Sequence, residues 1–144
     1  MPGGRVQLKE ETTMKNFTET VHYQEMLDAI TRHFKHAVKK HPYFCDGLLP
    51  TQVSKDWSDG EVRDTIINNL RLARERLEAS EKLGNRLWNE VLNCEVWEIN
   101  EALFNGNTAE AIEECCDSIA VLMRVICVLK GYQQLGSIII KRRI

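Results

Sequence analysis

The sequence has no long apolar run and no large excess of charge of one sign, and these absences exclude several classes of protein. No apolar stretch approaches the roughly 20 residues that a membrane-spanning helix needs. The 19 basic and 21 acidic side chains give a net charge of −2, so global electrostatics supply no strong attraction to a polyanion. We therefore expect no membrane partner and no stable nucleic-acid partner.

A disulfide framework is also missing. The five cysteines are odd in number and irregular in spacing, and the polar segment from Met1 to Thr13 is unlike a signal peptide. Reduced thiols are the simpler interpretation, and they predict a cytoplasmic protein. The period-two alternation of strands is absent except near the C-terminus, and the chain contains no internal repeat. A length of 144 residues predicts one domain with a real core.

Four stretches instead have the apolar spacing of amphipathic helices. They cover approximately residues 20–40, 59–80, 85–104 and 108–130. Together they predict an all-α, four-helix-type bundle with a long loop, residues 41–60, after the first helix. Pro42 should end the first helix, and Ser58 or Asp59 should cap the second. Gly84 either breaks the second helical stretch or is tolerated as a kink, and the sequence leaves both open.

The predicted domain boundaries follow from these stretches. Residues 1–18 are expected to form a mobile N-terminal tail, residues 19–131 the all-α domain, and residues 132–144 a C-terminal tail. Gly131 suits the position just after the last helix, and the three isoleucines at 138–140 favour an extended segment. In the long loop, Tyr43, Phe44 and Trp57 either pack the loop down or flank a base, and packing is the favoured interpretation.

Two short acidic motifs flank a predicted turn. Cys94-Glu95-Val96-Trp97-Glu98 lies before Phe104-Asn105-Gly106-Asn107, and Glu113-Glu114-Cys115-Cys116-Asp117 lies after it. Carboxylates at positions i and i+3 of a helix share one face. Two helices joined by so short a turn should be antiparallel neighbours, with Asn107 capping the second and Glu110 completing the cap. Four carboxylates would then converge, and hard oxygen ligands of this kind suit Mg²⁺ or Mn²⁺.

The alternative interpretation of these acidic residues is a solvated helix face, which is usual for charged side chains. Glu75, Glu78 and Glu81 fit that interpretation, because Arg71, Arg74, Arg76 and Lys82 surround them in the sequence. Around Asp117, however, the chain has no basic residue until Arg124. A carboxylate in such apolar surroundings is costly unless it binds a cation.

The order Glu95-x-x-Glu98 followed by Glu114-x-x-Asp117 resembles the MazG-like branch of the all-α nucleoside triphosphate pyrophosphohydrolases. The resemblance covers about residues 85–129 and includes the apolar approach from Leu87 to Leu92. One departure is Cys94, where that family often has glutamate. A shifted register that uses Glu101 and Glu113 instead stays open.

The resemblance implies Mg²⁺-dependent hydrolysis of a nucleoside triphosphate to the monophosphate and pyrophosphate, in a homodimer or homotetramer; Mn²⁺ is an alternative ion. It implies that Glu95, Glu98, Glu114 and Asp117 are metal ligands, and that Glu95 and Glu98 are also catalytic. Arg124 and Lys130 are candidates for binding the phosphates, although both also fit plain surface charges. Trp97 is a candidate wall for the base. Trp88, Tyr43 and Trp57 are others, and for each of these four aromatics core packing is the alternative.

Two other interpretations compete with the enzyme. His33, His36, His41 and Cys45 lie close in sequence, but Pro42 intervenes and no standard zinc spacing results. A non-catalytic helical oligomer, or an accessory protein that binds a nucleotide without turnover, would use the same apolar faces for partner helices.

Overall fold

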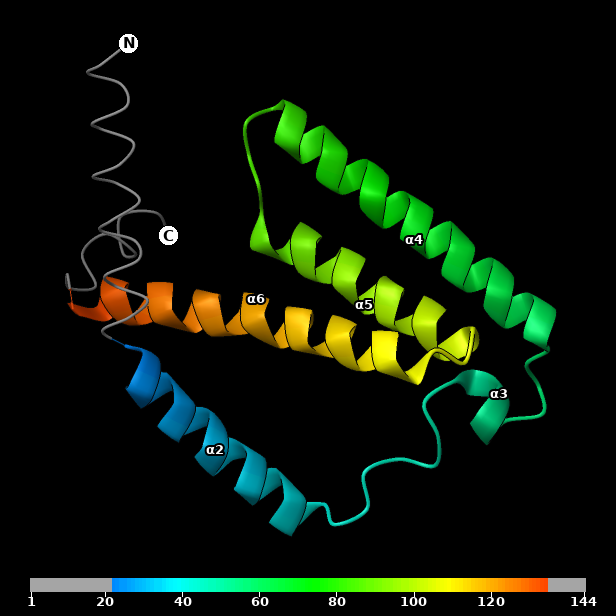
Figure 1. Cartoon of the computed structure of the whole chain (residues 1–144), viewed down its shortest axis with the longest axis horizontal. Helices are drawn as coiled ribbons and strands as arrows, with labels where there is room; N and C mark the ends of the chain where they lie inside the picture. Colours follow the sequence, from blue (N-terminus) through cyan, green and yellow to red (C-terminus); the bar gives the residue numbers. More distant parts are fainter. Residues whose placement is uncertain (1–21, 135–144) are drawn as a thin grey trace. The chain divides into compact units, whose positions relative to one another are not determined.

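The computed structural model describes residues 22–134, and in this range the chain is helical and contains no strand. The helices are α2 (Tyr23–Lys40), α3 (Pro50–Val53), α4 (Asp59–Lys82), α5 (Trp88–Phe104) and α6 (Thr108–Gln134), drawn in Figure 1. The predicted all-α class is therefore confirmed. No helix in the described range is both long and apolar enough to cross a membrane. The predicted N-terminal tail, residues 1–18, and residues 135–144 lie outside this range.

The chain divides into two compact units, and the division falls within α6. In the described range one unit contains residues 43–122, and the other contains residues 22–42 and 123–134. The first unit holds α3, α4, α5 and the first half of α6, which includes all four carboxylates of the predicted metal site.

In this first unit α4 and α5 lie side by side and antiparallel (Figure 1). Small side chains are buried on both helices: Ala73 is 1 % exposed on α4, and Cys94 and Ala102 are 5 % and 2 % exposed on α5. Small residues let two helix backbones approach closely. The apolar cluster of this unit contains Leu49, Val62 and Ile66, with Trp97, Leu103 and Phe104 packed against it.

Local sequence signals set both ends of α4. The Ser58 hydroxyl oxygen accepts a hydrogen bond from the N–H of Glu61 at 3.1 Å, so the predicted cap is Ser58. Gly84 has φ +81°, a left-handed conformation that favours glycine, and the Asn85 N–H donates to the Ser80 carbonyl at 2.9 Å. Gly84 therefore lies just past the end of α4 and breaks the helical stretch, which answers the question that the sequence left open.

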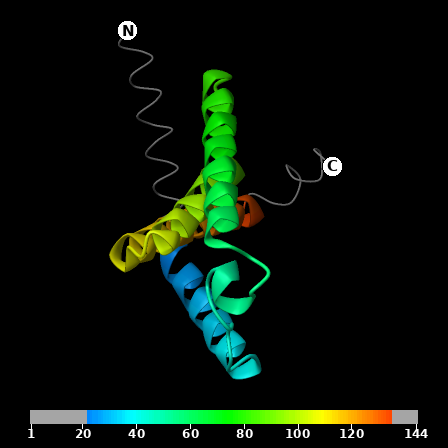
Figure 2. The ribbon, with the colours of Figure 1, turned by 90° about the vertical axis from the view of Figure 1, so that its right-hand side faces the viewer.

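The turn between α5 and α6 has the predicted chemistry. Gly106 has φ +72°, and the side-chain oxygen of Asn107 accepts a hydrogen bond from the N–H of Glu110 at 3.1 Å. The Asn107 amide in turn donates to the Glu110 carboxylate at 2.9 Å. These contacts start α6 immediately after the turn, the yellow end of the hairpin in Figure 2.

The long loop between α2 and α4 differs from the prediction. The one-turn helix α3 interrupts it, and the Gln52 side chain accepts hydrogen bonds from the N–H groups of Leu48 and Leu49 at 2.7 and 3.2 Å. The interpretation that loop aromatics pack down is wrong for the single chain: Tyr43, Phe44 and Trp57 are 69, 89 and 42 % exposed. Tyr43 makes a local contact instead, because its hydroxyl donates to Asp46 at 2.9 Å.

In the other unit, α2 and the second half of α6 meet through side chains. Met26 is 1 % exposed, and its sulfur lies 3.8 Å from the sulfur of Cys127, which is 3 % exposed. Lys130 forms an ion pair with Glu25 at 3.6 Å. The helix α6 continues through the buried Gly131 to Gln134, so residues 132–134 are helical and were wrongly placed in an extended tail. A helix interior accepts a glycine at a cost of about 1 kcal/mol.

Candidate metal centre

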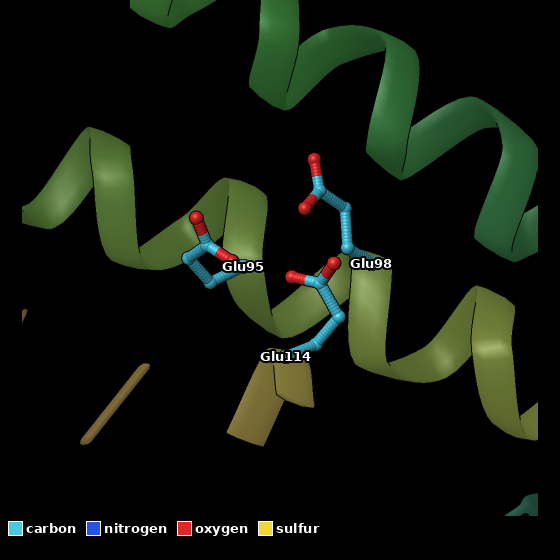
Figure 3. A group of neighbouring side chains, drawn as sticks. All are labelled: Glu95, Glu98 and Glu114. Carbon is cyan, nitrogen blue, oxygen red and sulfur yellow. The ribbon is translucent and has the colours of Figure 1, made fainter. Parts of the chain in front are cut away.

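The α5–α6 hairpin brings three glutamates together. Glu95 and Glu98 are one turn apart on α5, and Glu114 reaches them from α6 (Figure 3). One carboxylate oxygen of each residue lies within 4.8 Å of the corresponding oxygens of the other two. The predicted convergence across the hairpin is therefore present for these three residues.

Two oxygen atoms of this group are buried without a hydrogen-bond partner in the described part of the chain. They are Oε2 of Glu95 and Oε2 of Glu114. A buried carboxylate oxygen that neither accepts a hydrogen bond nor contacts a cation is costly. These two atoms therefore require a proton, a donor or a metal ion, and that requirement is the strongest sign of a ligand in this group.

The electrostatics of the group agree with its geometry. Burial raises the pKa of Glu98 above its usual range, and a hydrogen bond with Glu114 and the negative charge of Glu114 raise it further. A hydrogen bond with Glu95 raises the pKa of Glu114, with burial as the next cause. Carboxylates can share a hydrogen bond only when one is protonated. The raised pKa values of Glu98 and Glu114 mean that these crowded carboxyls favour their protonated form more than isolated glutamates do.

Arg74 contacts this group through its guanidinium, although its place in the sequence suggested only surface pairing with Glu75, Glu78 and Glu81. Its Nη2 atom on α4 lies 3.5 Å from Oε1 of Glu98, and its positive charge acts to lower the pKa of Glu98. The sequence offered no signal for this contact beyond the small apolar residue Ala73 before it, which the structure buries. One guanidinium against three carboxylates leaves excess negative charge.

Asp117 is not part of the group of three. Its side chain is exposed, although its charge is close enough to raise the pKa of Glu114. The alternative register is not supported either, because Glu101 and Glu113 also lie outside the group and Glu113 is exposed. The structure thus assembles three of the four predicted ligands, with Asp117 near their edge.

Cys94 replaces a glutamate of the resembled family with a neutral group. The thiol is 5 % exposed, and burial raises its pKa, with the charge of Glu98 as the second cause. It therefore stays protonated at neutral pH and adds no charge to the group. The four residues once considered for zinc are not brought together as a metal-binding group in the described range.

The predicted substrate-binding residues have other surroundings. Trp97 packs against the apolar cluster of its unit, which is the core-packing alternative. Lys130 pairs with Glu25, and both Lys130 and Arg124 belong to the unit that does not contain the glutamates. Of the other aromatic candidates, Trp88 is 51 % exposed, like the loop aromatics.

A depression lies on α4 and α5, and none of the three glutamates lines it. Its volume is about 310 Å³, at the lower end of the range for small-molecule sites. Apolar and charged side chains line it: Ile67, Leu70, Arg71, Arg74, Glu75, Glu78 and Glu101. Arg74 lines this depression and also contacts Glu98, so one side chain takes part in both features.

Comparison with known proteins adds no relative: no model of a protein family matches the chain, and neither does any curated protein or solved structure.

Proposed function

We propose that this protein is a Mg²⁺-dependent nucleoside triphosphate pyrophosphohydrolase, which converts a (deoxy)nucleoside triphosphate and water into the monophosphate and pyrophosphate. The observation that carries the proposal is the group of three glutamates with two buried, unpartnered oxygens. The motif order and the helical hairpin support it through the MazG-like resemblance. The donor set fits the ion, because Mg²⁺ prefers carboxylate oxygens and keeps several waters.

In this proposal Glu95, Glu98 and Glu114 hold the metal, and Asp117 acts at the edge of the site. When bound, Mg²⁺ supplies positive charge for the triphosphate and lowers the pKa of a coordinated water. A carboxylate of the group, for which we assign Glu95, accepts the proton of the attacking water. A new phosphorus–oxygen bond forms as the anhydride bond between the α- and β-phosphates breaks, and pyrophosphate leaves.

The test is incubation with a panel of canonical and modified nucleoside triphosphates in Mg²⁺ or Mn²⁺, with chromatographic separation of the products. We expect monophosphate and pyrophosphate, and we expect EDTA and Glu98→Gln to abolish both. Glu113→Gln is the matched control, since Glu113 is exposed on α6 and lies outside the group and outside the depression. No turnover of any nucleotide would reject the proposed reaction, and equal loss in both variants would reject the assigned site.

A helical oligomer is the second candidate, and one observation favours it. Ile112, Ile119 and Leu122 on α6 are 59, 52 and 43 % exposed, and with Cys115 they follow the three- and four-residue steps of a coiled-coil seam. An enzyme that assembles as a homodimer or homotetramer would use this face as well. Light scattering tests the assembly, and metal dependence separates the two functions: a purely structural oligomer is indifferent to Mg²⁺ and to Glu98→Gln.

A further inference from the structure

We propose that Arg74 is an anion-binding residue of this site, which neutralises Glu98 in the metal-free protein and binds a phosphate group of the triphosphate once a divalent cation is held. This inference rests on the proposed function and deepens it. It assigns to α4 the positive charge that the sequence analysis sought at Arg124 and Lys130.

The ion pair between Arg74 and Glu98 is loose enough to exchange. Its 3.5 Å separation exceeds the roughly 2.7–2.9 Å of a strong charge-assisted hydrogen bond. The Arg74 side chain is 58 % exposed, whereas that of Glu98 is 28 % exposed. A pair in which the guanidinium is this exposed contributes little net stability, so a divalent cation on Glu98 can displace the guanidinium at small cost.

A guanidinium of Arg74 that is displaced from Glu98 would lie beside a depression that can hold a ligand. Arg74 lines the depression of about 310 Å³ on α4 and α5 together with the apolar Ile67 and Leu70. A guanidinium has five N–H donors in a planar fork, and this geometry matches the oxygens of a phosphate. A triphosphate held by metal at the glutamates would therefore meet Arg74 at the border between the carboxylates and the depression.

Arg71 provides the comparison within the same helix. It lies about one turn before Arg74 and lines the same depression, but its guanidinium pairs with Glu75 at 3.3 Å. Both side chains are similarly exposed, at 60 and 58 %. Arg74 is thus distinguished from Arg71 by its contact with the glutamate group and not by general surface charge.

The proposal predicts two effects of opposite sign in Arg74→Met. Removing the competing cation should tighten Mn²⁺ binding about two- to fivefold, in line with the small strength of exposed pairs. Removing the phosphate donor should raise the KM for the triphosphate about tenfold. Arg74→Lys keeps the charge but not the fork, so we expect it to recover part of the lost substrate affinity.

The experiment has two parts, both on the full chain. Mn²⁺ binding is titrated by electron paramagnetic resonance, and steady-state kinetics are measured with a triphosphate that the wild type hydrolyses. Wild type, Arg74→Met, Arg74→Lys and Arg76→Met are compared. Arg76 is exposed on the same helix and lines neither the depression nor the glutamate group, so Arg76→Met should change neither quantity by more than twofold. If Arg74 only holds α4 against α5, both affinities fall together with thermal stability. That result overturns the proposal, as does an unchanged KM in Arg74→Met.

Different results reject the proposed function and the proposed role of Arg74. If the wild type binds no Mn²⁺ and hydrolyses no triphosphate, the proposed function and the role of Arg74 both fall. If the wild type is active and Glu98→Gln is not, but Arg74→Met behaves like Arg76→Met, then only the role of Arg74 is rejected.

Discussion

Replacing Glu114 with glutamine should make the metal-free protein more stable at neutral pH, although it removes a native side chain. One oxygen of each glutamate lies within 4.8 Å of the others. At this separation two unit charges repel by about 1 kcal/mol in water and by about 3 kcal/mol at an effective dielectric constant of 20. The partial exposure of Glu98, 28 %, favours the lower figure. We therefore expect about 1 kcal/mol of stabilisation and a rise in Tm of about 4 °C.

Addition of a divalent cation should reverse this order of stability. At a free metal concentration 100-fold above Kd, binding to the folded state stabilises the wild type by about 2.7 kcal/mol. The variant loses one charged ligand and keeps only a weaker, neutral oxygen at that position. Its Tm should therefore hardly change on addition of Mg²⁺ or Mn²⁺, and the wild type becomes the more stable of the two.

In the absence of metal, the difference in stability between the wild type and Glu114→Gln should depend on pH, and the direction of the change is predictable. The pKa values of Glu98 and Glu114 are raised in the folded protein, so the folded state holds protons more tightly than the unfolded state. The stabilising contribution is fully present below the ordinary pKa of glutamate and is lost as the pH rises through the raised values. In EDTA the wild type should lose stability relative to the variant over this interval, and the two should converge in acid.

Thermal unfolding followed by circular dichroism, in EDTA and in Mg²⁺ or Mn²⁺, measures all three effects. Glu113→Gln is the matched control, because it makes the same charge change on the adjacent residue of α6, whose side chain is exposed and outside the group. It should show neither the stabilisation nor the inversion. A Glu114→Gln variant that is less stable than the wild type in EDTA at neutral pH, or that metal stabilises as much as the wild type, would contradict this prediction.

Two further substitutions test the turn between α5 and α6 and the N-terminal cap of α4. Gly106→Ala places a side chain at φ +72° with no atom within 4 Å of the new Cβ, so backbone strain alone should cost about 1–2 kcal/mol in a urea titration. Because this turn aligns Glu114 with α5, Mn²⁺ affinity should fall too, and unchanged affinity would mean that the helices align without the turn. Ser58→Ala removes the acceptor for the Glu61 N–H and should cost about 1 kcal/mol, with Mn²⁺ affinity unchanged. No loss of stability would show that water replaces this cap.

The features that the sequence predicted well are local ones. The cap at Asn107, the turn at Gly106 and the end of α2 before Pro42 depend on side chains and backbone angles within a few residues. Glu95 and Glu98 share a face because they are one turn apart. Predicting that they lie close to Glu114 required one further assumption, that a short turn joins antiparallel neighbouring helices. The three carboxylates do lie close together in the structure.

The features that the sequence did not predict depend on packing between elements. Arg74 and Glu98 are on different helices, and their contact follows from how α4 packs on α5 through small residues such as Ala73. Asp117 satisfies the same i, i+3 rule as its neighbours, yet it lies towards solvent because the spacing fixes a face only approximately. Hydrophobicity alone suggested burial of Phe44, but the single chain leaves it 89 % exposed.

The excess negative charge of the glutamate group makes its stability depend on two solution variables. A proton can relieve the repulsion, as the raised pKa values of Glu98 and Glu114 indicate, and so can a metal ion. Arg74 offsets one charge but leaves the two buried oxygens of Glu95 and Glu114 without a partner. Protons and divalent cations should therefore compete for the same oxygens, and metal affinity should rise with pH even if the nucleotide chemistry proves to be different.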